Sequence, residues 1–189
     1  MKGATTPHTE SLLDLFLRAL NDTEPEVLSN AAFATGLLVE CSDIDLSSQY
    51  LTILSALRPL FEVTPESPSA RINAKDNAAG AVARIIFKNK NTIPFDQVMP
   101  VFLNALPLIH DFLENTAVFR ALFHLFRTDT APLRPHTEQI LRLFAHVLDP
   151  NNTEQITDAV REELLNLIVA LNTENPHAIQ EVGLGVYLP

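Results

Sequence analysis

Four positions along the sequence carry an amide or carboxylate side chain at spacings of 47, 38 and 43 residues: Asn30, Asn77, Asn115 and Asp158. Five further acids lie close to these positions: Glu26, Asp111, Glu154 and Glu162 about one helical turn away, and Glu114 next to Asn115. An amide both donates to and accepts from a peptide backbone, and carboxylates bind lysine and arginine side chains. This set of positions predicts a surface for an extended basic peptide. The alternative is that these residues are helix caps and solvated helix edges, where Asn and Asp are common in any protein.

Catalytic chemistry has no comparable set of residues. The six histidines include no pair four residues apart around a glutamate, and the glycine patterns of nucleophile elbows and phosphate loops are missing. Glu162 and Glu163 are adjacent, so on a helix they point about 100° apart and cannot share a substrate proton. Cys41 has no partner cysteine in the sequence and no basic neighbour to activate it. The sequence therefore predicts a protein that is not an enzyme and that needs no metal or cofactor.

The charge balance limits the class of partner. Acids outnumber Lys and Arg by 23 to 13, for a net charge of −10, whereas binding to nucleic acid needs a basic patch. A basic protein segment is the better electrostatic match, although the acidity also keeps a protein soluble. The uncharged runs are too short to span a bilayer, so we expect no membrane partner.

The elements that position the polar residues repeat along the chain. A period of about 40–47 residues is typical of stacked helical pairs, none of which buries its apolar face alone. A helix, a turn with Asp22 and Pro25, and an Ala- and Gly-rich helix follow the layout of a HEAT repeat. The sequence therefore predicts an all-α fold, an α-α superhelix or HEAT-repeat solenoid over residues 9–175. We expect four pairs at about 9–44, 47–90, 93–129 and 133–173, and an incomplete repeat or tail at 176–189.

Apolar periodicity and turn residues set the expected helix boundaries. The expected helices cover residues 11–20, 26–40, 47–61, 70–88, about 93–106, 112–127, 134–148 and 153–171. Thr92 is the candidate cap of the fifth helix, Phe95 is expected on its buried side, and residues 62–69 are an expected exposed loop. An array that ends in part of a repeat would leave an apolar face uncovered, as would Leu12 and Phe16 at its start. We therefore expect a piece of a longer solenoid, or ends that pair with another chain.

Several motifs in a fixed order resemble the C-terminal HEAT repeats of the karyopherin-β nuclear import receptors, in the branch of importin four and its fungal counterparts. They are residues 76–86 (DNAAGAVARII), 93–100 (IPFDQVMP), 106–108 (LPL) and 111–120 (DFLENTAVFR). The resemblance covers roughly residues 26–171. It implies a carrier of basic cargo, notably histones three and four and ribosomal proteins, that shuttles between cytoplasm and nucleus under control of the Ran GTPase. It also implies that the regions that bind Ran and the main regions that bind nucleoporins belong to parts of the receptor outside this chain.

In this family the second helix of each repeat lines the concave side, and an asparagine with nearby acids holds a cargo lysine. Carried over, the asparagine is Asn77 and one acid is Glu114, while Leu113 replaces a second acid of the family. We therefore expect Asn77 and Glu114 to contact cargo, with Asn30, Asn115, Asp158 and Glu162 as neighbours. The alternative is a segment that only continues the solenoid, or an interaction module without cargo contact.

Overall fold

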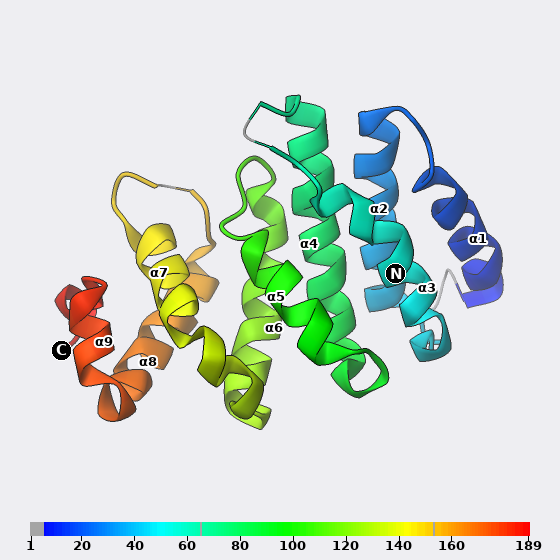
Figure 1. Ribbon diagram of the computed structural model, residues 1–189. Helices are drawn as coiled ribbons and strands as arrows, with labels where there is room; N and C mark the ends of the chain where they lie inside the picture. The colour runs from blue at the N-terminus through cyan, green and yellow to red at the C-terminus, as the bar shows by residue number, and fades with distance from the viewer. Residues whose placement is uncertain (1–5, 65, 153) are drawn as a thin grey trace. The chain divides into compact units, whose positions relative to one another are not determined.

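The fold is described from a computed structural model in which residues 6–64, 66–152 and 154–189 are described. Within these ranges all regular secondary structure is helical, with no strand. The chain divides into two compact units, residues 1–121 and 122–189, and the division falls within one helix. The prediction of an all-α protein built from HEAT-type helical repeats is confirmed (Figure 1).

The first unit contains the helices of the N-terminal two thirds of the chain. They are α1 (Thr9–Ala19), α2 (Pro25–Cys41), α3 (Tyr50–Leu57), α4 (Ser69–Asn89), α5 (Phe95–Asn104) and the beginning of α6 (Asn115–Thr128). Short 3-10 helices at Ser47–Gln49 and Arg58–Phe61 extend α3 at both ends. Figure 1 shows α2 and α4 side by side, with α3 in front of them.

Small residues allow α2 and α4 to pack closely. A Cβ atom added to Gly36 of α2 would lie 2.9 Å from the Cα of Ala81 in α4, closer than real Cβ contacts come. Ala78, Ala79 and Ala83 of α4 are also fully buried. The Ala- and Gly-rich runs in the sequence therefore mark the contact between α2 and α4, the second helices of two successive helical pairs.

A buried carboxylate fixes the segment between α5 and α6. One oxygen of Asp76, Oδ2, accepts hydrogen bonds from the backbone N–H groups of Ile109, His110 and Asp111 at 3.0, 2.7 and 3.1 Å. Lys75 Nζ lies 3.0 Å from the other oxygen and donates to the carbonyl of Ala105 at 2.9 Å. These backbone N–H and carbonyl groups lie outside the helices and have no helical hydrogen-bond partner. The side chains of Asp76 and Lys75 supply the missing partners, and this compensates for the cost of burying two charged residues.

The second unit continues from the end of α6. It contains a 3-10 helix at Ala131–His136, α7 (Thr137–Leu148), α8 (Asp158–Glu174), α9 (Pro176–Glu181) and a 3-10 helix at Leu184–Tyr187. Its core includes Phe144 of α7 with Leu164 and Ile168 of α8. Ile179 and Leu184 are fully buried, and the Tyr187 hydroxyl donates to the carbonyl of Leu148 at 2.7 Å. Residues 176–187 thus pack against α7 and α8.

Most helix positions match the sequence prediction, and three details are wrong. Thr92 does not cap α5, because it lies in a 3-10 turn, where its hydroxyl donates to the carbonyl of Asn89, and Pro94 precedes the helix. Phe95 is only half-buried and has Lys90 Nζ 5.5 Å above its ring. The last long helix begins at Asp158, with Thr157 as its cap, and not near Thr153, which lies outside the described residues.

Candidate functional site

The six predicted site residues fall into two groups by exposure. Asn30 on α2 and both Asp158 and Glu162 on α8 are exposed. Asn77, Glu114 and Asn115 are only 5%, 2% and 2% exposed. Exposed acids can meet a partner directly, whereas the buried residues are engaged within the chain.

Asn77 links α4 to α2. Its Nδ2 donates to the hydroxyl of Ser29 at 2.9 Å. Its Oδ1 is buried and has no hydrogen-bond partner among the described residues. Asn77 therefore keeps one hydrogen-bond acceptor, Oδ1, without a partner beside the contact between α2 and α4.

Glu114 pairs with a buried arginine of α4. Arg84 forms two hydrogen bonds with this carboxylate, one from Nη1 to Oε2 and one of 3.1 Å from Nη2 to Oε1. The Nε of the same guanidinium donates to Glu40 of α2 at 2.8 Å. Arg84 thus joins α2 and α4 to the start of α6. Its partners are Glu40, 44 residues before it, and Glu114, 30 residues after it.

The same network reaches a second arginine. Arg120 Nη1 donates to the other oxygen of Glu40 at 2.8 Å, and its guanidinium lies 4.3 Å from the ring centre of Phe87. Burial raises the pKa of Glu40, but the hydrogen bonds from Arg84 and Arg120 lower it by more, so its net pKa is below the ordinary value. Burial lowers the pKa of Arg84, but its bonds with Glu114 and Glu40 raise it by more. Both groups are therefore held in their charged forms.

Gly80 leaves the space that Glu114 fills. A Cβ atom added to Gly80 would lie 1.4 Å from Glu114 Oε2 and 3.0 Å from Arg84 Nη1. The neighbouring Leu113, where the resemblance implies a second acid, is 85% exposed. To hold a cargo lysine directly, Glu114 would have to release Arg84, so the predicted contact of Asn77 and Glu114 with cargo stays a prediction.

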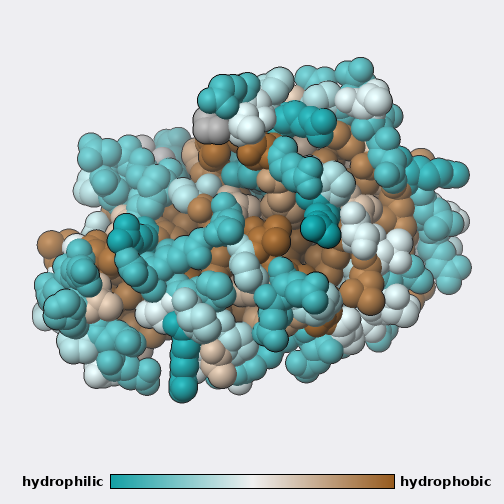
Figure 2. Space-filling view, viewed as in Figure 1, coloured by the Kyte–Doolittle hydropathy of each residue, from teal (hydrophilic) through white to brown (hydrophobic). Residues whose placement is uncertain are grey.

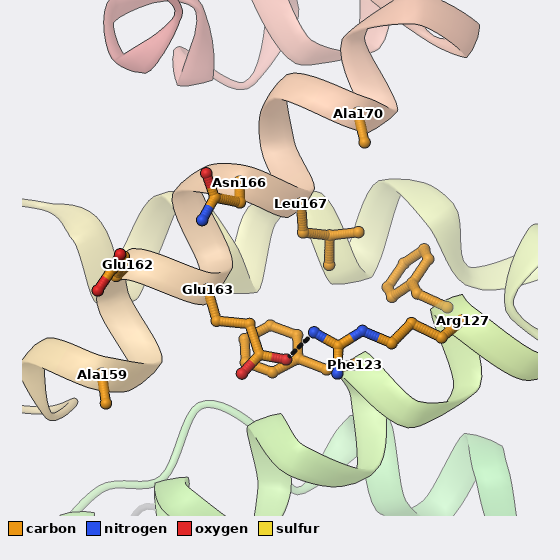
Figure 3. Close-up of a pocket in the computed structure, with 9 residues that line it drawn as sticks. Phe123, Arg127, Ala159, Glu162, Glu163, Asn166, Leu167 and Ala170 are labelled. Carbon is orange, nitrogen blue, oxygen red and sulfur yellow. Dashed lines mark hydrogen bonds and ion pairs between the residues drawn. The ribbon is translucent and has the colours of Figure 1, made fainter.

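The second unit contains a groove of about 610 Å³ between the end of α6 and α8 (Figure 3). Its apolar lining consists of Phe123, Phe126, Ala159, Leu167 and Ala170. Figure 3 shows Leu167 and Ala170 along the side of α8 that faces α6. The groove therefore has an apolar wall on both helices.

Four polar side chains complete the lining: Arg127, Glu162, Glu163 and Asn166. Arg127 Nη2 donates to Glu163 Oε1 across the groove. Among the described residues no cation is paired with Glu162, and it lies one turn from Asn166 and from Asp158 on α8. The groove thus combines one neutralised acid with one that remains available.

Sequence reasoning identified Glu162 but missed the other groove residues. Phe123 borders the groove but is only 4% exposed, so it belongs to the core as well, and Glu163 was considered only as half of a catalytic pair. Arg127 lies 36 residues from Glu163, and no local spacing relates the two. The available signal was the spacing of Ala159, Glu163, Leu167 and Ala170, which places them along one side of a helix.

A second groove, of about 260 Å³, lies in the first unit between α3 and α5. It is mostly apolar and includes Leu54, Val98 and Phe102. Figure 2 shows hydrophobic side chains gathered near these helices among hydrophilic ones.

In the described ranges, no three His, Cys, Asp or Glu side chains are grouped so as to hold a metal ion. None of the helices described here has the length and apolar character needed to cross a membrane.

Comparison with known proteins relates almost the whole chain to importins. No protein-family model matches the sequence. The chain is 40% identical over 168 residues to the probable importin subunit beta-4 of Schizosaccharomyces pombe, covering 89% of this chain and 15% of that protein. It is 26% identical over 173 residues to importin-4 of Homo sapiens and 25% identical over 174 residues to importin-4 of Mus musculus. Each of these matches covers 92% of this chain and 16% of the relative. The predicted resemblance is thereby confirmed: this chain is a homologue of a segment of the importin-4-type proteins.

Proposed function

We propose that this chain is a cargo-binding segment of a nuclear import receptor, and that it holds a lysine-rich stretch of a basic protein. The observation that carries the proposal is the homology to importin-type proteins over 89% of the chain at 40% identity. The net charge of −10 agrees with a basic partner. Histones three and four and ribosomal proteins are the cargo that the resemblance implies.

The exposed members of the predicted site are the proposed direct contacts. Asp158 and Glu162 lie on successive turns of α8, with spacing that suits an extended basic segment. Asn30 offers an exposed amide on α2. The burial of Glu114 and Asn77 favours an indirect role, in which they fix the helices that carry the contacts.

The rest of the transport cycle is assigned to other parts of such a receptor. Ran and the nucleoporins would bind regions outside this chain, which spans about a sixth of the length of the relatives it matches. The segment would then shuttle between cytoplasm and nucleus with the whole receptor. It would bind protein without catalysis or a cofactor.

A purely structural role in the solenoid is the second candidate. The network of Arg84, Glu40 and Glu114 favours it, because these charges join helices and are not free for a partner. In that case the acids of α8 would only keep the surface solvated. Binding of a basic peptide to the chain separates the two candidates.

The test is a titration of a labelled histone-tail peptide into the full chain at low and high salt. Replacing Asp158 by Asn together with Glu162 by Gln should weaken binding about threefold to tenfold, because exposed ion pairs contribute modestly. Glu10→Gln with Asp14→Asn on α1 is the control with the same change in charge. Equal affinities for wild type and the α8 variant would refute the assignment of these contacts, and absence of binding would favour the structural role.

A further inference from the structure

We infer that the groove between the end of α6 and α8 is a subsite for one lysine side chain of an extended basic partner, with Glu162 as the carboxylate that receives the ammonium group. This inference rests on the proposed function and specifies where one cargo side chain would bind. It uses the residues shown in Figure 3.

The apolar wall matches the stem of a lysine side chain. Lysine buries its methylene groups along apolar surface while its charged end stays near polar groups. Phe126 and Leu167 are both half-buried and offer such a surface from the two helices, and Ala159 is small enough to leave the groove open below Glu162. A short polar side chain would leave this wall in contact with water.

The chain already places one long cationic side chain in this groove. Arg127 extends from α6 to the carboxylate of Glu163 alongside Phe123 (Figure 3). The groove therefore accommodates an alkyl stem with a terminal cation. Glu162 repeats the acidic half of this arrangement, and among the residues described it has no basic partner.

The charge of the groove selects the occupant. Glu162 and Glu163 outnumber Arg127, so the lining carries a net negative charge. An acidic side chain would be repelled, and an uncharged one would remove water from Glu162 without replacing its hydrogen bonds. A lysine provides both the stem and the charge.

The test uses the full chain and a short labelled peptide of alternating lysine and serine, compared with a version in which norleucine replaces lysine. Norleucine keeps the stem and removes the charge. Glu162→Gln should weaken binding of the lysine peptide about threefold to fivefold and leave the norleucine peptide unaffected. Glu138→Gln on α7, an exposed acid outside the groove, is the matched control.

A steric variant tests the apolar wall separately. Ala159→Phe should fill the groove next to Glu162 and weaken the lysine peptide, whereas Val169→Phe, an exposed position of α8 outside the lining, should not. Arg127→Gln should strengthen binding about twofold to fivefold, because it removes the competing cation. Helical circular dichroism checks that each variant is folded.

The outcomes separate this inference from the proposed function. If wild type binds the lysine peptide but neither Glu162→Gln nor Ala159→Phe changes its affinity, the subsite is wrong while the proposed function stands. If wild type binds neither the lysine peptide nor a histone tail, both are overturned. Loss of affinity in both groove variants, with both controls unchanged, supports the subsite.

Discussion

Replacing Glu114 by Gln tests whether this acid holds the fold together or contacts a partner. Its carboxylate is 2% exposed and forms two hydrogen bonds with the guanidinium of Arg84. Removing one member of a buried ion pair costs about 3–5 kcal/mol, because the other charge stays buried without compensation. Arg84 keeps its bond to Glu40, and glutamine retains one acceptor, so we expect a loss of about 3 kcal/mol in the free energy of unfolding.

The assay is urea unfolding followed by helical circular dichroism, with the change taken from the midpoint at constant slope. Glu138→Gln is the control, because its pair with Arg142 is exposed and should contribute less than about 0.5 kcal/mol. The affinity of folded Glu114→Gln for a histone-tail peptide should equal that of wild type. A loss of stability below about 1 kcal/mol, together with weaker peptide binding, would refute the structural role and restore the direct contact.

Three further predictions concern the same region. Gly80→Ala should lower the free energy of unfolding by about 2 kcal/mol or more, because its Cβ would overlap Glu114 Oε2; an unchanged urea midpoint would contradict the observed packing. Leu113→Glu should raise the affinity for a lysine-rich peptide about twofold to fivefold, because it adds a carboxylate at an exposed position. Isothermal titration calorimetry at low salt measures this affinity, and an unchanged value would mean that the peptide does not bind near residue 113. Because the pKa of Glu40 is lowered in the folded chain, its stabilising contribution is present above its ordinary pKa of 4.5 and is lost as the pH falls through the lowered value. Urea unfolding at a series of pH values should therefore show the stability gap between wild type and Glu40→Gln closing in acid, and a gap that widens there would have the wrong sign.

The fold was largely predictable because its signals are local. The apolar spacing along α1 and the position of Pro25 at the start of α2 identify elements without knowledge of their partners. The Ala- and Gly-rich run of α4 predicted close packing, and the contact of Gly36 with Ala81 provides it. The start of α8 was misplaced because residues 154–157 (EQIT) are compatible with a helix or a loop, so only the cap at Thr157 decides the boundary.

The candidate site was less predictable because it depends on contacts between distant residues. The spacing of Asn77 and Glu114 fits an exposed site and a buried network equally well. What distinguishes them is Arg84, whose partners lie 44 residues before it and 30 after it. Asp76 likewise gives no local sign that it binds the backbone of residues 109–111. Asp158 and Glu162 lie on successive turns of α8, as their spacing indicates, and their contact with a partner stays a prediction.

The central claim is that this chain binds a basic segment through exposed carboxylates. The most direct measurement compares the affinity of the full chain for a lysine-rich peptide and for a glutamate-rich peptide of equal length, each at low and high salt. The account predicts binding of the lysine-rich peptide that weakens as salt rises, and no binding of the glutamate-rich peptide. Equal affinity for both peptides, or binding of the lysine-rich peptide that does not respond to salt, would contradict it.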